Sequence, residues 1–88
     1  MSDVKFRNIT SEPMGDKPTT DLPGIGKVLS TRLKEGGFEK ASQVYGQFLV
    51  LNRDHVRFET WMNINFQADR NKALKCSKAL DAYYTTFN

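Results

Sequence analysis

Residues 21–29 read DLPGIGKVL and are the best candidate for chemistry in this chain. Gly24 and Gly26 flank one isoleucine; glycines adopt backbone angles that other residues avoid and leave no side chain between backbone and ligand. A helical pattern follows, and the first amides of a helix lack partners within it and carry partial positive charge. Such amides bind phosphate oxygens, and Lys27 adds a mobile positive charge there. The stretch therefore predicts a phosphate-binding turn.

Ile25 is expected to anchor this turn in the core while the neighbouring amides face outward. The whole segment resembles the helix-hairpin-helix, a motif that holds the DNA backbone without reading base sequence, and we place it at about residues 19–36. The alternative is a helix–helix turn whose glycines serve geometry alone. Binding through phosphates predicts an affinity that falls steeply as salt is added.

The elements that must position this turn are helical throughout, because apolar residues recur at three- and four-residue spacing and no segment alternates as a strand would. We expect a compact, all-α single domain, residues 1–88, of four or five short helices. In chain order these are a helix over 4–9, one from Lys27 that ends at Gly36-Gly37, one over about 39–51, one capped by Asp54 and a last one capped by Asp69.

Each predicted helix has an apolar face that we expect to be buried. The expected core residues are Ile25, Val28, Leu29, Leu33, Ala41, Val44, Tyr45, Phe48, Leu49, Phe58, Trp61, Met62, Ala73, Cys76, Leu80, Tyr83, Tyr84 and Phe87. Gly46 interrupts a helix at a cost of about 1 kcal/mol relative to alanine, so close approach of another chain is one explanation. Val50 lies off the buried face and suggests a contact patch, or else packing against a neighbouring helix.

Composition limits the remaining possibilities. The net charge of +3 suits a polyanionic partner, and 39% hydrophobic with 26% charged residues is ordinary for a folded domain. A single cysteine, Cys76, excludes a disulfide within the chain and favours a reducing compartment. No catalytic constellation, metal site, cofactor motif or membrane-spanning run is expected, and His55 is predicted to be a surface residue. The sequence therefore predicts a binding protein and no enzyme.

Further motifs extend the resemblance over nearly the whole chain. They are SEPMGDKP at 11–18, GIGKVL at 24–29, GFEKA at 37–41, YGQFLVL at 45–51 and FETW at 58–61. Their order and spacing resemble those of the barrier-to-autointegration factor family. The resemblance implies a small, SAM-like, all-helical nuclear protein that forms a homodimer. Its two helix-hairpin-helix motifs would point in opposite directions, so that the dimer bridges double-stranded DNA.

The resemblance also implies partners and places. The partners would be LEM-domain proteins of the inner nuclear membrane, with lamins and histones as further candidates and no direct insertion into a membrane. The protein would organise chromatin and the nuclear envelope, and would also be found in the cytoplasm. Phosphorylation near the N-terminus, which weakens DNA binding in the family, carries over by position only to Ser2.

Residue roles carry over where the chain matches the family. Lys5 matches a basic DNA-contacting residue, Arg32 replaces a lysine, and Lys27 stands where many relatives carry an acid. The expected DNA-binding set is Lys5, Gly24, Ile25, Gly26, Lys27, Val28, Arg32, Arg70, Asn71 and Lys72, with Lys72 preferred among the last three. The expected partner and dimer surface consists of Gly46, Val50 and Leu51.

Two other functions compete with DNA bridging. One is a helical protein-interaction adaptor whose hairpin binds DNA weakly or no longer binds it. The other is an accessory domain of a repair enzyme that uses the same motif. The last third of the chain departs most from the family, with Tyr83 in place of a tryptophan, so the departure bears on dimer contacts more than on the fold.

Overall fold

The computed structural model describes residues 3–87 and contains five α-helices and one short 3-10 helix in that range. The helices are α1 (Asp3–Ser11), η1 (Thr19–Asp21), α2 (Lys27–Glu35), α3 (Ala41–Val50), α4 (His55–Phe66) and α5 (Arg70–Phe87). Within the described range there is no β-strand, only one isolated bridge between Pro18 and Lys40. The predicted all-α, single-domain fold is confirmed.

The helix ends are set by local capping residues that the sequence analysis predicted. Gly37, which follows the C-cap Gly36 of α2, adopts a φ of 96°, a conformation that favours glycine and ends the helix. Asp54 caps α4, since its Oδ1 accepts the amide of Arg57 at 3.0 Å. Asp69 caps α5 in the same way, accepting the amide of Lys72 at 3.3 Å. Both predicted aspartate caps are confirmed.

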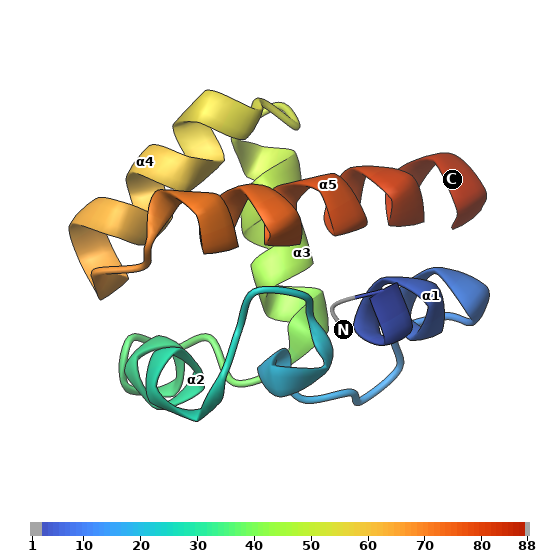
Figure 1. Cartoon of the computed structure of the whole chain (residues 1–88), viewed down its shortest axis with the longest axis horizontal. Helices are drawn as coiled ribbons and strands as arrows, with labels where there is room; N and C mark the ends of the chain where they lie inside the picture. The colour runs from blue at the N-terminus through green and yellow to red at the C-terminus, as the bar shows by residue number, and fades with distance from the viewer. Residues whose placement is uncertain (1–2, 88) are drawn as a thin grey trace.

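The helix α5 organises the molecule (Figure 1). It runs across most of the width of the view and packs against α1, α3 and α4, while α2 lies below it and contacts α4 and η1. Side chains from all five α-helices meet in one core. The largest fully buried ones are Phe48, Phe58, Ile9, Leu22, Ile25, Leu33, Met62 and Leu80. No helix in residues 3–87 combines the length and the apolar character needed to cross a bilayer.

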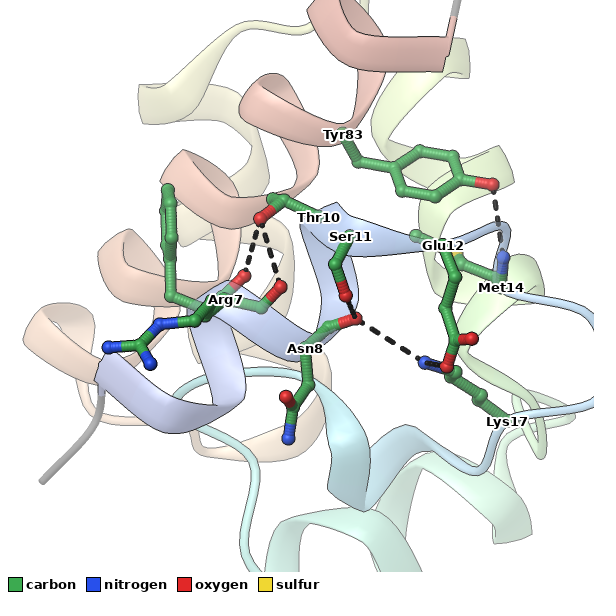
Figure 2. A network of polar contacts seen from close by, with 9 residues as sticks. Arg7, Asn8, Thr10, Ser11, Glu12, Met14, Lys17 and Tyr83 are labelled. Atoms are coloured by element: carbon green, nitrogen blue, oxygen red, sulfur yellow. Dashed lines mark hydrogen bonds and ion pairs between the residues drawn. The ribbon is translucent and has the colours of Figure 1, made fainter.

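The loop between α1 and η1 is held by polar contacts to Tyr83 of α5 and by those of Lys17 (Figure 2). The amide of Met14 donates to the buried Tyr83 hydroxyl of α5 at 3.1 Å. On the outer side, Lys17 Nζ lies 2.8 Å from Glu12 Oε1 and donates to the Asn8 carbonyl at 3.4 Å. The hydrogen bond and positive charge of Lys17 lower the pKa of the Glu12 carboxyl. Tyr83 thus ties α5 to the loop that leads into η1.

Three side chains that we expected in the core are exposed. Val28 is 66% exposed, Leu49 is 36% exposed, and Phe87 at the end of α5 is also exposed. The reason is helical geometry, because consecutive residues are about 100° apart around a helix axis. Leu29 and Phe48 face the core, so Val28 and Leu49, their immediate neighbours, face elsewhere. Tyr45, Trp61 and Tyr84 are half-buried rather than fully enclosed.

The prediction that His55 is a surface residue was wrong. The ring is half-buried, its Nδ1 hydrogen-bonds to the hydroxyl of the buried Ser77, and its centroid lies 6.1 Å from that of Phe48. The first turn of α4 packs directly onto α5, which turns this face of the helix inward. His55 therefore links the start of α4 to α5.

Candidate nucleic-acid interface

The turn between η1 and α2 is anchored by its isoleucine. Ile25 is only 1% exposed, and its amide donates to the carbonyl of the fully buried Leu22 at 3.2 Å. The element η1 is fixed to α2 as well, since the hydroxyls of the buried Thr19 and of Ser30 are 2.6 Å apart. The expected anchoring of the turn by Ile25 is confirmed.

Gly24 is required by the fold itself. Its φ of 82° lies in the left-handed region, which other residues rarely adopt. A Cβ added there would lie 2.1 Å from the backbone carbonyl oxygen of Lys72, at the start of α5. Gly24 therefore lets the turn, which rises toward α5 in Figure 1, approach that helix closely.

Gly26 is a glycine for a different reason. Its φ of −97° and ψ of −170° form extended backbone that any residue adopts, so the expectation of unusual angles was wrong at this position. A Cβ added to Gly26 would meet no atom within 4 Å. The missing side chain instead leaves the start of α2 open to the surroundings.

The amides at this helix start have no internal partner. The first amide bonded back to the helix start is that of Ser30, which donates to the Gly26 carbonyl at 2.9 Å. Among residues 3–87 no acceptor binds the amides of Gly26, Lys27 or Val28. All three residues are exposed. They form a cluster of donors at the positive end of the helix dipole.

A hollow of about 370 Å³ opens in front of these donors, between the start of α2 and the segment that joins α4 to α5. Its lining residues are Gly24, Gly26, Lys27, Val28, Leu29, Arg32, Gln67, Ala68, Asp69 and Lys72. Three of them carry positive charge, and the one acid, Asp69, is engaged as the cap of α5. The hollow thus combines free amide donors with cationic side chains, which suits a phosphate group.

The predicted DNA-binding residues fall into three groups. The residues that line the hollow are Gly24, Gly26, Lys27, Val28, Arg32 and Lys72, and Ile25 lies buried beneath it. Arg70 and Asn71 are exposed at the start of α5 but do not line it. Lys5 lies on α1, and its Nζ donates to the Ile25 carbonyl at 3.1 Å. Ser2 lies outside the described residues.

Arg32 has a structural contact in addition to its position in the hollow. Its Nη1 donates to the Phe66 carbonyl at 3.2 Å, at the C-terminal end of α4. Carbonyls at a helix C-terminus lack partners within the helix and attract positive charge. Arg32 therefore joins α2 to α4 and still has further N–H donors available.

Besides Leu29, which was predicted as a core residue, three lining residues were not predicted as part of the site: Gln67, Ala68 and Asp69. Gln67 ends α4 with a φ of 56°, and the Ala68 carbonyl accepts from Asn63 Nδ2 at 3.0 Å. In the sequence only Asp69 carries a local signal, and that signal indicates a helix cap. Their place in the hollow results from the way α4 and α5 pack, which no short motif encodes.

A second surface of interest lies on α3. Val50 is 72% exposed, and the half-buried Leu51 packs partly on the core. A Cβ added to Gly46 would meet nothing within 4 Å outside its own helix. Packing within the chain therefore does not explain why the middle of this helix carries a glycine. The predicted partner surface extends from Gly46, in the middle of α3, to Val50 at its end and Leu51 directly after it.

Taken together, η1, the anchored turn and the open start of α2 fit the description of a helix-hairpin-helix protein. The family model described as barrier to autointegration factor matches residues 1–87. Barrier-to-autointegration factor of Drosophila melanogaster is 42% identical over 83 residues, which cover 94% of this chain and 92% of the relative. The proteins of that name from Mus musculus and Homo sapiens are 43% and 41% identical, with 94% of this chain and 93% of each relative covered.

The chain belongs to the barrier-to-autointegration factor family. Membership supports a DNA-binding, chromatin-associated role in the nucleus. The family is one of non-enzymatic DNA-binding proteins. The predicted family is thereby confirmed.

Proposed function

We propose that the chain binds double-stranded DNA through phosphates at the start of α2, without reading base sequence. The observation that carries the proposal is the set of amides at Gly26, Lys27 and Val28, which have no acceptor within residues 3–87 and open into a hollow with cationic walls. One phosphate held there would receive amide hydrogen bonds and the charge of Lys27, Arg32 and Lys72. Arg70 and Asn71, at the start of α5, would contact the neighbouring backbone.

We further propose that the protein acts as a homodimer that bridges two DNA segments. A single site that touches a few phosphates binds weakly, and linking two such sites raises the effective affinity without any new contact. Two-fold symmetry supplies the second site from an identical chain. The exposed Val50 and the uncrowded Gly46 on α3 support an interface there, and Leu51 would lie at its edge.

The same family membership supports the choice of partners. LEM-domain proteins of the inner nuclear membrane would bind the dimer over the α3 surface, and lamins and histones are further candidates. The protein would then organise chromatin at the nuclear envelope, with a further pool in the cytoplasm. This role is that of an architectural protein and requires no catalysis, cofactor or metal.

Substitution of Gly26 tests the DNA site more cleanly than substitution of Gly24, because a side chain fits at position 26 and collides with α5 at position 24. Gly26→Asp and Gly26→Asn have the same shape, and both side chains can cap α2. Only the aspartate brings a negative charge to the place proposed for a phosphate. We expect Gly26→Asp to weaken binding to a random-sequence duplex at least about tenfold more than Gly26→Asn does.

The control for net charge is Asn52→Asp. Asn52 is exposed in the loop between α3 and α4, which lies at the opposite end of the view from α2 in Figure 1. Fluorescence anisotropy at two salt concentrations measures all three variants, and Asn52→Asp should bind close to the parent chain. Equal binding by Gly26→Asp and the parent would refute the proposed site.

The exposed apolar residues of α3 also favour the adaptor function. Leu49 and Val50 would contact a protein partner even if the hairpin did not bind DNA. A pull-down with a purified LEM domain tests this function, with Val50→Glu as the variant that should fail. Capture of the LEM domain without any duplex binding would favour the adaptor over the bridging protein.

A further inference from the structure

Lys5 is placed on the inner side of the phosphate-binding turn. It lies on α1, is half-buried, and donates from Nζ to the Ile25 carbonyl oxygen at 3.1 Å, across 20 residues of sequence. No carboxylate in residues 3–87 forms an ion pair with it. The contact of its ammonium group is therefore with the turn backbone, whereas the sequence led us to expect a direct contact with DNA.

The carbonyl of Ile25 and the amide of Gly26 belong to one peptide unit. No peptide bond in the described chain is cis, so this unit is planar and its N–H points away from its C=O. Lys5 holds the carbonyl side, and the amide side has no acceptor among the described residues and opens into the hollow. Fixing the carbonyl thus fixes the direction of the free N–H.

The turn needs such a restraint because of its sequence. The side chain of Ile25 is enclosed and Gly24 is packed against the Lys72 carbonyl, so the ends of the turn are held. The plane of the peptide between Ile25 and Gly26 can still rotate, since glycine permits a wide range of φ. In residues 3–87 the bond from Lys5 is the contact that holds this carbonyl.

A cation on the carbonyl also changes the amide electronically. A charge-assisted hydrogen bond to one side of a polar group polarises it and strengthens the bond made on the other side. The ammonium of Lys5 therefore makes the Gly26 N–H a better donor to an anion. Both effects, orientation and polarisation, act on the group that we place against DNA.

We propose that Lys5 is a positioning residue for phosphate binding, which acts through the Ile25–Gly26 peptide and does not itself contact the phosphate. This inference rests on the proposed DNA-binding function and deepens it. It separates two roles for positive charge around one turn: Lys27 and Lys72 face the phosphate from the hollow, and Lys5 orients the backbone from behind.

The first test uses the free protein, so that it does not depend on DNA. Lys5→Met keeps the length of the side chain and removes its charge, Lys5→Arg restores a cationic donor, and Lys78→Met removes the same charge from an exposed lysine of α5. In ¹H–¹⁵N spectra the Gly26 amide should shift clearly in Lys5→Met, return toward the parent position in Lys5→Arg, and stay in place in Lys78→Met. An unmoved Gly26 amide in Lys5→Met would overturn the proposal.

The second test separates positioning from phosphate contact. Each lysine that contacts a phosphate contributes roughly 0.9 to the slope of log K against log salt concentration. Lys5→Met should weaken duplex binding about tenfold. Its slope of log K against log salt concentration should equal that of the Lys78→Met control, because no phosphate contact is lost. Unchanged affinity, or a slope lower by one contact, would refute the positioning role. Failure of the parent chain to bind any duplex would instead refute the proposed function, and the free-protein spectra would still decide whether Lys5 holds this peptide.

Discussion

The turn before α2 and the exposed face of α3 differ in whether contacts within one chain account for their residue types. At the turn, three residues have roles within the chain: Ile25 fills the core, Gly24 lets α5 approach, and Lys5 of α1 holds the backbone. On α3, Gly46 has open space around it and Val50 is largely exposed, so neither is explained by contacts within one chain.

This difference separates two kinds of surface. The turn is preorganised, because its unpaired amides are held in place before any ligand arrives, which lowers the entropy lost on binding. The α3 face consists of apolar groups that gain stability only when another molecule covers them. We therefore expect substitutions at internally packed residues of the turn, such as Gly24, to affect the folding of one chain, and substitutions on α3 to affect association.

The largest effect is expected when the two turn glycines are compared. Gly24→Ala should lower the free energy of unfolding by about 2–5 kcal/mol, from the left-handed φ and the collision with the Lys72 carbonyl. Gly26→Ala should cost less than about 1 kcal/mol, because its backbone is extended and the space is open. Urea denaturation measures both, and similar losses would contradict the internal role of Gly24.

The next prediction compares two exposed valines. Val50 on α3 and Val56 on α4 are 72% and 68% exposed, so the same change to glutamate costs each folded chain little. Val50→Glu should weaken self-association at least tenfold, about 1.4 kcal/mol, because the charge enters the proposed interface. Val56→Glu should leave association unchanged. Sedimentation equilibrium measures the dissociation constants, and equal effects of the two variants would exclude α3 as the interface.

Gly46 offers a test in which stability and association change in opposite directions. In Gly46→Ala the added Cβ meets nothing within the chain, so the higher helix propensity of alanine should stabilise an isolated chain by up to about 1 kcal/mol. Close packing of a second chain would lose contact, and the dimer should dissociate more readily. Denaturation under dilute, monomeric conditions and sedimentation together measure the two effects. Tighter association in this variant would argue against close approach at α3.

The smallest effect concerns the core beneath both regions. Cys76 is fully buried, and burial raises the pKa of its thiol. Above the pKa of about 8.5 in the unfolded chain, the unfolded state loses the proton and the folded state keeps it, so stability falls as pH rises. The loss should be roughly 0.8 kcal/mol between about pH 7.5 and pH 9, and Cys76→Ala should lack it. Identical pH profiles for the two proteins would contradict a protonated, enclosed thiol.

Much of the fold could be predicted from the sequence because the signals are local. Gly37, Asp54 and Asp69 end or cap helices through contacts within a few residues, and all three lie where the sequence indicates. Ile25 was also predictable, since it continues the apolar face of the following helix and is buried as expected. The errors at Val28 and Leu49 arose where two consecutive apolar residues compete for one helix face.

The remaining features depend on contacts between distant segments. The hydrogen bond from Lys5 to the Ile25 carbonyl, the packing of Gly24 on α5 and the contact of His55 with Ser77 each join residues far apart in the chain. The family resemblance implies that Lys5 lies near DNA, but it does not identify the atom that the ammonium group of Lys5 contacts. The distinct reasons for the two glycines likewise became visible only in three dimensions.

The most direct test of the proposed phosphate-binding turn follows the amides themselves. In ¹H–¹⁵N spectra recorded during titration with a random-sequence duplex, the amides of Gly26, Lys27 and Val28 should show the largest shifts, because they gain charged acceptors. Amides in the middle of α3 should move little. Unmoved resonances at the start of α2, with the duplex bound and the shifts elsewhere, would contradict the account.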